Sequence, residues 1–143
     1  MSSVVWTSSV SIGSQSGSAC LGYTTINDPT RNSALAGSSS PCDDGQLFNS
    51  SSGGAWIRFV GTGGTTLASS PTDIGYCGAF LTGWYNATLP TTVGATVNGT
   101  VCIRTLADTC AFGLEVPVVF CPGNFYVYFL TPLPVCNARY CTA

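Results

Sequence analysis

Hydrophobic and polar residues alternate along several short segments of the chain, and this two-residue period predicts β-strands rather than helices. In residues 55–61 the even-numbered side chains share one face of an extended chain, and Ile57 and Phe59 share the other. Two further segments rich in β-branched residues cover residues 3–12 and 95–106. We expect all three segments to be strands.

A hairpin over residues 114–131 is the clearest local signal. This segment reads LEVPVVFC, then PGN, then FYVYFLT. Pro122 and Gly123 suit the central positions of a type II turn, because proline presets φ and glycine accepts a positive φ. Both faces of the second arm are apolar, which predicts a central strand. Because Pro117 cannot donate a ladder hydrogen bond, we expect the first arm to lie at a sheet edge or to hold a bulge.

Loops separate these predicted strands. Glycine, serine, proline and aspartate cluster in residues 34–54, which predicts a long loop. No segment has a long helical period, although a helical turn fits near residues 28–36 or 105–111. The pattern predicts an all-β fold, a single disulfide-stapled, antiparallel, β-sandwich-like domain with long loops.

The chain divides into two parts by composition. Residues 1–19 join the predicted strand at 3–12 to a flexible tether of small polar residues at 13–19. Residues 20–143 contain every cysteine and form the predicted cysteine-rich domain. The length of 143 residues fits one such domain.

Charged residues are scarce. Only 7% of the residues are charged, 45% are hydrophobic, and the formal net charge is −2. Four scattered arginines form no basic patch for a phosphate backbone, so nucleic acid is not an expected partner. Histidine and lysine are absent, which removes imidazole catalysis, histidine metal ligands and Schiff-base chemistry. We therefore expect neither an enzyme nor a bound cofactor.

Eight cysteines at wide spacing indicate a disulfide framework, which forms in an oxidising compartment. Zinc is the rival interpretation. A zinc site needs two closely spaced ligand pairs, and the shortest gap here has no second pair to match it. We expect a secreted, extracellular protein without a metal, while spacing alone leaves the pairing of the cysteines open. The predicted disulfide residues are Cys20, Cys42, Cys77, Cys102, Cys110, Cys121, Cys136 and Cys141.

Three Asn-X-Ser/Thr sequons agree with secretion, since the motif is the acceptor for N-glycans. They begin at Asn49, Asn86 and Asn98. Glycans there would supply the solubility that charge does not. No stretch approaches the roughly 20 apolar residues of a membrane-spanning helix, so no membrane span is expected.

The acidic residues carry weaker hints of chemistry. Asp43 and Asp44 could begin a calcium loop, but further spaced acids are missing, and an exposed turn beside Cys42 is the simpler interpretation. We expect Asp28 and Arg31 to pair locally or to cap a helical turn. A glycosidase needs two acids that converge across a cleft, and the six acids of this chain do not suggest such a pair.

Aromatic residues could form a platform on which sugars stack. Trp6, Trp56 and Trp84, together with six tyrosines, are the candidates. Aromatic residues at strand spacing more often belong to a core, so carbohydrate binding is a second hypothesis rather than the first.

Taken in order, several segments resemble the extracellular cysteine-rich domain of the uromodulin and pancreatic zymogen-granule glycoprotein family. The resemblance covers residues 20–143 and is most specific in the strand WIRFVG, the aromatic strand FYVY with its proline-rich tail, and the closing Cys-x4-Cys. It implies a domain that normally has ten cysteines, of which this chain lacks two, consistent with the loss of one bridge. It further implies a Cys102–Cys110 bridge and a Cys77–Cys141 bridge. Asn86 lies where the family carries a glycan.

The resemblance implies a non-catalytic, secreted structural glycoprotein that displays N-glycans and takes part in extracellular filaments or matrix. Residues 3–12 lie outside the resemblance. A tethered strand can complete its own sheet or be donated to a neighbouring subunit, which would make the chain self-associate. The alternative function is a monomeric carbohydrate- or protein-binding extracellular module. The residues assigned to this candidate assembly strand are Val4, Val5, Trp6, Val10 and Ile12.

Overall fold

The computed structural model describes residues 19–44, 48 and 53–143. Within these residues nearly all regular structure is β, apart from a helical turn at 19–21 and the one-turn 3-10 helix η1 (Pro29–Arg31). The strands are β2 (Thr24–Ile26), β3 (Ala55–Phe59), β4 (Leu81–Tyr85), β5 (Thr96–Arg104), β6 (Phe112–Cys121), β7 (Phe125–Leu130) and β8 (Ala138–Tyr140).

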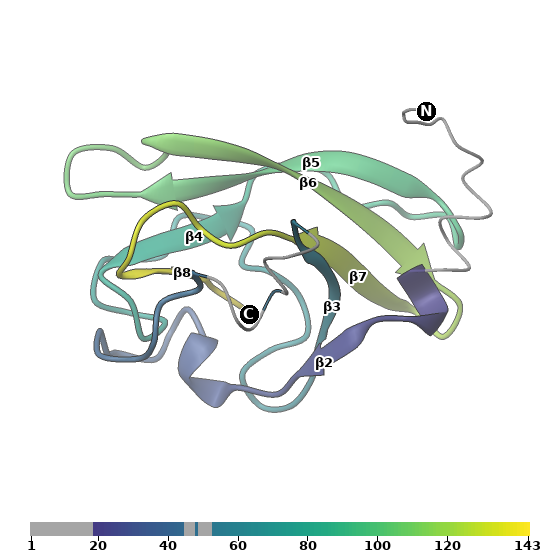
Figure 1. The fold of residues 1–143 in the computed structure, drawn as a ribbon, viewed down its shortest axis with the longest axis horizontal. Helices are drawn as coiled ribbons and strands as arrows, with labels where there is room; N and C mark the ends of the chain where they lie inside the picture. Colours follow the sequence, from purple (N-terminus) through teal and green to yellow (C-terminus); the bar gives the residue numbers. More distant parts are fainter. Residues whose placement is uncertain (1–18, 45–47, 49–52) are drawn as a thin grey trace.

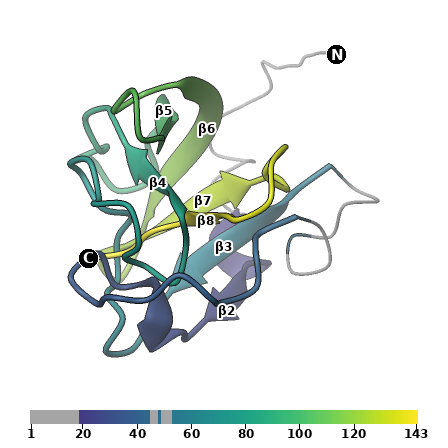
Figure 2. The same ribbon diagram turned by 90° about the vertical axis from the view of Figure 1, so that its left-hand side faces the viewer.

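The seven strands form one sheet in the order β2-β3-β7-β6-β5-β4-β8 (Figure 1). The sheet curls, so that β4, β5 and β6 lie across from β2 and β3 (Figure 2). The four inner pairings are antiparallel, whereas β2 pairs with β3 and β8 with β4 in parallel. The predicted all-β, disulfide-stapled domain is confirmed, with parallel pairing at both edges, where three-residue strands reach the sheet by long connections.

The predicted hairpin is confirmed in β6 and β7. Val119 pairs with Val127, and the Asn124 N–H donates to the Cys121 carbonyl across the turn at 3.1 Å. Gly123 has a φ of 100°, the left-handed conformation for which glycine is suited. β7 lies between β3 and β6, so it is central, as the two apolar faces predicted.

Pro117 lies in β6, which is not an edge strand of the sheet. Even so, the N–H that proline lacks would not have bonded to a neighbouring strand. The Phe120 N–H donates to the Ala95 carbonyl on the β5 side, and alternate residues of a strand face the same neighbour, so Pro117 faces the β7 side. β7 pairs with β6 only at residues 118–121. Pro117 thus lies where β6 is locally an edge.

The core fills the concave side of the sheet. Ile57, Val101, Val118 and Leu130 are fully buried there. A smaller cluster on the outer side packs Ala19 against Val119 and Val127 of the hairpin. Burial on both sides of the hairpin explains its nearly continuous apolar sequence.

β4 has a glycine in its middle. A Cβ at Gly83 would come within 3.0 Å of the Arg139 carbonyl oxygen, so the glycine lets β8 approach closely. The sequence of residues 81–85 does not by itself predict a strand, because a glycine in the middle of a strand weakens it. Only the close approach of β8 explains the glycine here.

Four disulfides tie loops and edges to this sheet, and they use all eight cysteines. Cys102–Cys110 closes the β5–β6 hairpin, whereas the other three bridges join residues far apart in the sequence. The pairs are Cys20–Cys121, Cys42–Cys136, Cys77–Cys141 and Cys102–Cys110.

Candidate display and assembly surfaces

The β8 edge of the sheet is covered by the segment at residues 31–43. The Asp43 N–H donates to the Ala138 carbonyl at 3.0 Å, and the Thr142 N–H donates to the Arg31 carbonyl at 2.9 Å. The Ser33 N–H in turn donates to the Thr142 carbonyl at 2.8 Å. This segment therefore occupies the Ala138 carbonyl of β8 and both backbone groups of Thr142, which follows β8.

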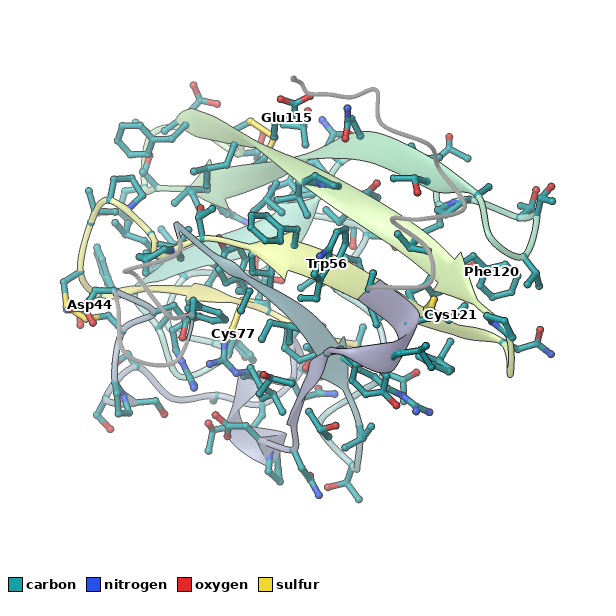
Figure 3. The ribbon with its side chains drawn as sticks, turned by 45° about the vertical axis from the view of Figure 1, so that its right-hand side comes forward. Asp44, Trp56, Cys77, Glu115, Phe120 and Cys121 are labelled. Atoms are coloured by element: carbon teal, nitrogen blue, oxygen red, sulfur yellow. A yellow bond between two sulfur atoms is a disulfide. The ribbon has the colours of Figure 1, made fainter. Side chains whose placement is uncertain are left out.

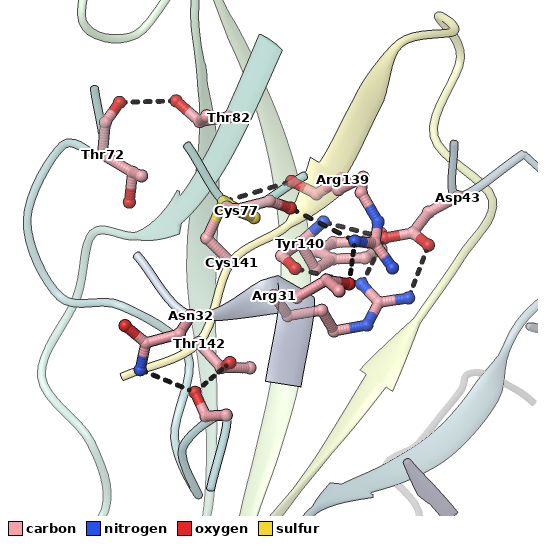
Figure 4. Close-up of a disulfide and its surroundings, with 12 residues drawn as sticks. Arg31, Asn32, Asp43, Thr72, Cys77, Thr82, Arg139, Tyr140, Cys141 and Thr142 are labelled. Carbon is pink, nitrogen blue, oxygen red and sulfur yellow. Dashed lines mark hydrogen bonds and ion pairs between the residues drawn. A yellow bond between two sulfur atoms is a disulfide. The ribbon is translucent and has the colours of Figure 1, made fainter. Parts of the chain in front are cut away.

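A buried ion pair completes this cover (Figure 4). The Asp43 carboxylate accepts hydrogen bonds of 2.7 Å from both terminal nitrogens of Arg31, and the two side chains are 2% and 1% exposed. Asp43 Oδ2 also accepts the Tyr140 N–H at 2.8 Å, and Arg31 donates to the Tyr140 carbonyl at 3.0 Å. Each charged group thus has a charged partner and a backbone partner, as burial requires.

The expected exposed turn at Asp43 is therefore wrong, although its neighbour Asp44 is exposed as expected. Local sequence favours a turn at an Asp-Asp-Gly run, but the edge of β8 needs an acceptor and the Arg31 guanidinium needs a counter-charge. Both oxygens of Asp43 are engaged in this way, so this carboxylate is not open to a calcium ion.

Asp28 caps η1 and pairs with a second buried arginine. Asp28 Oδ1 accepts the Thr30 N–H at 3.1 Å, and Oδ2 accepts from Arg139 at 2.6 Å. Arg31 Nε lies 3.5 Å from Asp28, so the expected local pair and cap are both present. Burial acts to raise the pKa of Asp28, but hydrogen bonds from Thr30 and the charge of Arg139 outweigh it and lower the pKa.

The cluster packs against the Cys77–Cys141 bridge (Figure 4). Arg139 donates to the Cys77 carbonyl at 3.2 Å, and Cys141 directly follows Tyr140 in β8. Both cysteines are fully buried. A long-range disulfide and two buried arginines therefore hold the same corner of the fold.

All four arginines interact with groups inside the molecule. Arg104 pairs with Asp73 at 3.1 Å, and the Arg58 guanidinium lies 3.8 Å from the centre of the Phe125 ring. The acids without an arginine partner are Asp44, Asp108 and Glu115, all exposed. Figure 3 shows Asp44 and Glu115 projecting outward. The outer surface is therefore weakly acidic and has few free charges.

Two of the predicted glycan acceptors lie on one face of β4 and β5. Trp84 pairs with Cys102, and the Asn86 N–H donates to the Thr100 carbonyl at 2.7 Å, so Asn86 continues this pairing. Side chains two residues apart share a face, which places Asn98 on the face of Thr100 and Cys102. Both asparagines are exposed.

The candidate tryptophans do not form one platform. Trp84 is only 9% exposed, and its indole N–H donates to the Thr109 carbonyl at 2.8 Å. Trp56 is half-buried on β3, where its ring packs edge-on against Phe129. Three strands separate β3 from β4 in the sheet, so these two rings belong to different regions.

Some predicted residues lie outside the described part of the chain. These are Asn49 and the candidate assembly strand with its tether up to residue 18. Among the described residues, the ligand atoms of Cys42, Asp44 and Cys136 lie within 4.8 Å of one another. The two sulfur atoms are bonded in a disulfide, so neither is a thiolate that could hold a metal.

Sequence reasoning missed Asp43 and Arg139 as partners of the buried cluster. Nothing in the local pattern marks either residue, because their partners are separated by 12 and 111 positions in the chain. The only available signal was the scarcity of charge, since a chain with four arginines has few candidates for any buried ion pair.

The family model of the uromodulin-like domain matches residues 57–142. The chain belongs to this family. The matched region contains β4 to β8 in full and the second half of β3, and so it includes the centre and the β8 edge of the sheet. The resemblance stated from the sequence is confirmed, and two bridges that it implied, Cys102–Cys110 and Cys77–Cys141, are present in the structure.

Two groups of relatives agree with this membership. The human (Homo sapiens) pancreatic secretory granule membrane major glycoprotein GP2 is 34% identical over 123 residues, which are 86% of this chain and 22% of the relative. Its dog (Canis lupus familiaris) counterpart is 33% identical over 131 residues, 92% of this chain and 24% of the relative. Mouse (Mus musculus) uromodulin is 36% identical over 87 residues, 61% of this chain and 14% of the relative.

This uromodulin-like chain therefore spans about a quarter or less of the curated relatives it matches. Family membership and the four disulfides make it a secreted, extracellular domain, as the cysteine count predicted. None of the helices in the described part of the chain is long and apolar enough to cross a membrane.

Proposed function

We propose that this uromodulin-like domain is a non-catalytic structural glycoprotein module. In this proposal it displays N-glycans and self-assembles into extracellular filaments or matrix, with the N-terminal strand at residues 3–12 donated to a neighbouring subunit. Two of the relatives are called glycoproteins by name, which supports glycan display.

The observation that carries the proposal is the shared face of Asn86 and Asn98. Two acceptors on one exposed strand face would gather glycans on the β4–β5 side and leave the β2–β3 side of the sheet open to protein contact. The lack of free positive charge supports the same arrangement, because copies of the chain have little charge that must be desolvated when they pack together.

Glycan display is tested on the secreted chain by mass spectrometry before and after enzymatic removal of N-glycans. We expect Asn86→Gln and Asn98→Gln each to remove the mass of one glycan from the intact protein. If both single variants keep the wild-type glycan mass, glycan display from this face is wrong.

Assembly is tested by electron microscopy and size-exclusion chromatography of the full chain. We expect polymers from the full chain, and subunits from a variant that lacks residues 1–16. Glycan removal serves as the control that separates the contribution of the glycans from that of the strand. A truncated chain that assembles as the full chain does would rule out strand donation but not assembly itself.

Carbohydrate binding is the second candidate, and the half-buried Trp56 beside Phe129 favours it. Glycan-array binding by a monomeric chain that is lost in Trp56→Ala would support this function. Trp84→Ala is the wrong variant for the purpose, because Trp84 is buried and would report on folding instead.

A further inference from the structure

We propose that the outer edge of β2 is the acceptor site for the donated strand, and that its occupant is residues 3–12 of a second copy of this chain. The inference rests on the proposed assembly by strand donation, and it adds where the strand binds. A sheet of seven strands has two outer edges, β2 and β8, and β6 adds a local edge at residues 112–117, where β7 does not pair with it. Glu115, which is exposed, and Pro117 protect that local edge, because charged residues and prolines disfavour strand addition. Of the two outer edges, β8 is covered and β2 is open among the described residues.

The β8 edge is closed to an added strand. The segment at residues 31–43 already bonds to Ala138 and Thr142, and the buried Asp43 carboxylate occupies the Tyr140 N–H. An incoming strand would have to displace a charged pair that is 1% and 2% exposed. Opening this edge would separate the buried Arg31–Asp43 ion pair and remove the acceptor of the Tyr140 N–H, which is unfavourable.

The β2 edge is open among the described residues. The Ile26 carbonyl accepts the Val60 N–H at 2.9 Å, so Ile26 faces β3, and alternation along the strand turns the N–H and C=O of Thr25 outward. Thr25 is exposed, and no described strand pairs with this side of β2. Exposed backbone groups at a sheet edge are a template for another strand.

Residues 23–27, which include β2, have no guard against such pairing other than the shortness of the strand. Asp28 and Pro29 follow directly and limit an added strand to about this length. Natural edge strands are commonly protected by lysine, proline or inward-pointing charges. Residues 23–27 read YTTIN, with neither a charge nor a proline. Five residues span about 17 Å of extended chain, which is enough backbone for a short added strand.

The occupant matches this edge in its side-chain pattern. The even positions of residues 3–12 carry four apolar residues and one serine, whereas the odd positions are polar except for Val5. Beside β2, an apolar face would extend the concave core next to Ile26, which is only 6% exposed. The polar face would then lie on the side of Thr25.

The choice of a second copy follows from the proposed assembly by strand donation, and the point where the described chain begins is compatible with it. Ala19 is packed against Val119 and Val127, and Cys20 is bonded to Cys121, so the root of the tether lies on β6 and β7. β6 is three strand positions from β2, about 14 Å across the sheet. Residues 13–18 can span about 20 Å when extended, so the length of the tether does not distinguish a second copy from the same copy, whereas the oligomeric state does.

Thr25→Pro tests the acceptor edge directly. Proline removes the outward N–H of Thr25 and no hydrogen bond to β3, so the fold should remain and the acceptor should be lost. Thr25→Ala keeps the N–H and is the matched control. The donor strand is blocked in a separate full-length variant that carries both Thr7→Pro and Ser8→Pro. Adjacent N–H groups of a strand point to opposite sides, so one of these two prolines removes an N–H that would face the acceptor edge.

We expect the wild type and Thr25→Ala to form polymers, and Thr25→Pro and the donor variant each to remain subunits. Mixed together, the last two should form one-to-one dimers and nothing larger, because one supplies the strand and the other supplies the edge. Amide hydrogen exchange of Thr25 should be slow in the wild-type polymer and fast in the donor variant. This measurement does not depend on the folding of Thr25→Pro.

Polymers of wild-type size from Thr25→Pro would overturn this acceptor site while leaving assembly intact. Fast exchange of Thr25 in the wild-type polymer would do the same. A monomeric full chain with slow Thr25 exchange would assign the strand to its own sheet and overturn the second copy. A monomeric full chain with fast exchange would overturn both this inference and the proposed assembly.

Discussion

The Asp43 carboxylate holds the Arg31 guanidinium through two hydrogen bonds of 2.7 Å, although 12 positions separate the residues in the chain. The same carboxylate accepts the backbone N–H of Tyr140 at 2.8 Å. This charged pair, together with backbone hydrogen bonds such as that from the Asp43 N–H to the Ala138 carbonyl, joins a loop to a sheet edge. This pair makes one edge of the sheet unavailable to other chains while the β2 edge stays exposed.

Loss of the buried charge at Asp43 should destabilise the domain strongly. Asp43→Asn leaves the buried Arg31 with only the longer 3.5 Å contact to Asp28, a carboxylate that Arg139 shares. We expect the free energy of unfolding to fall by about 3–5 kcal/mol. Asp44→Asn, at the exposed neighbouring position, should change it by less than about 0.5 kcal/mol. Denaturant unfolding with the disulfides intact measures both. Equal effects of the two substitutions would contradict the structure.

Asp28 should make stability depend on acid pH. Its pKa is lowered in the folded state, below the ordinary value of 3.8, so folding favours the ionised form. The stabilisation is fully present above the unfolded pKa and is lost as pH falls through the folded pKa. The difference in melting temperature between wild type and Asp28→Asn should therefore shrink as pH falls from about 5 to about 2. A difference that stays constant over this range would refute the ion pair with Arg139.

Tyr140 should resist ionisation at alkaline pH. Burial raises its pKa to about 12, and the nearby Asp43 charge adds to the effect against the hydrogen bond to Thr131. Because the folded pKa lies above the ordinary value of 10, stability is full below pH 10 and falls as pH rises toward 12. In an alkaline titration followed by absorbance at about 295 nm, which reports tyrosine ionisation, Tyr140 should ionise only near the pH at which the domain unfolds. Tyr140→Phe should reduce the amplitude of the late ionisation and leave the earlier steps unchanged. The late ionisation does not vanish, because burial also raises the pKa of Tyr128 and of Tyr85.

The four disulfides should contribute unequally. Cys20–Cys121 spans 101 positions and Cys102–Cys110 spans 8. In the chain-entropy model, these loops correspond to about 4.7 and about 2.5 kcal/mol of stability. Paired serine substitutions at each bridge, compared by denaturant unfolding, should reproduce that order. A larger loss at the short bridge would show that native packing, rather than loop length, dominates.

The sequence predicted the local elements whose signals lie within a few residues. The alternation in residues 55–61 appears as β3, and the Pro122-Gly123 turn joins β6 to β7. Strands at 24–26, 81–85 and 138–140 were not predicted. Two of them are three residues long, and Gly83 weakens the third, so only pairing with a neighbour makes them strands.

The cysteine count and the absence of histidine and lysine by themselves determined the class of protein: an extracellular disulfide domain without imidazole or lysine chemistry. The tertiary structure alone decided where the few charges lie. Asp43 and Arg139 meet partners brought together by chain reversals and by the Cys77–Cys141 bridge. It also decided which sheet edge is closed, because hydrogen bonds between distant segments depend on their positions in space and leave no periodic trace in the sequence.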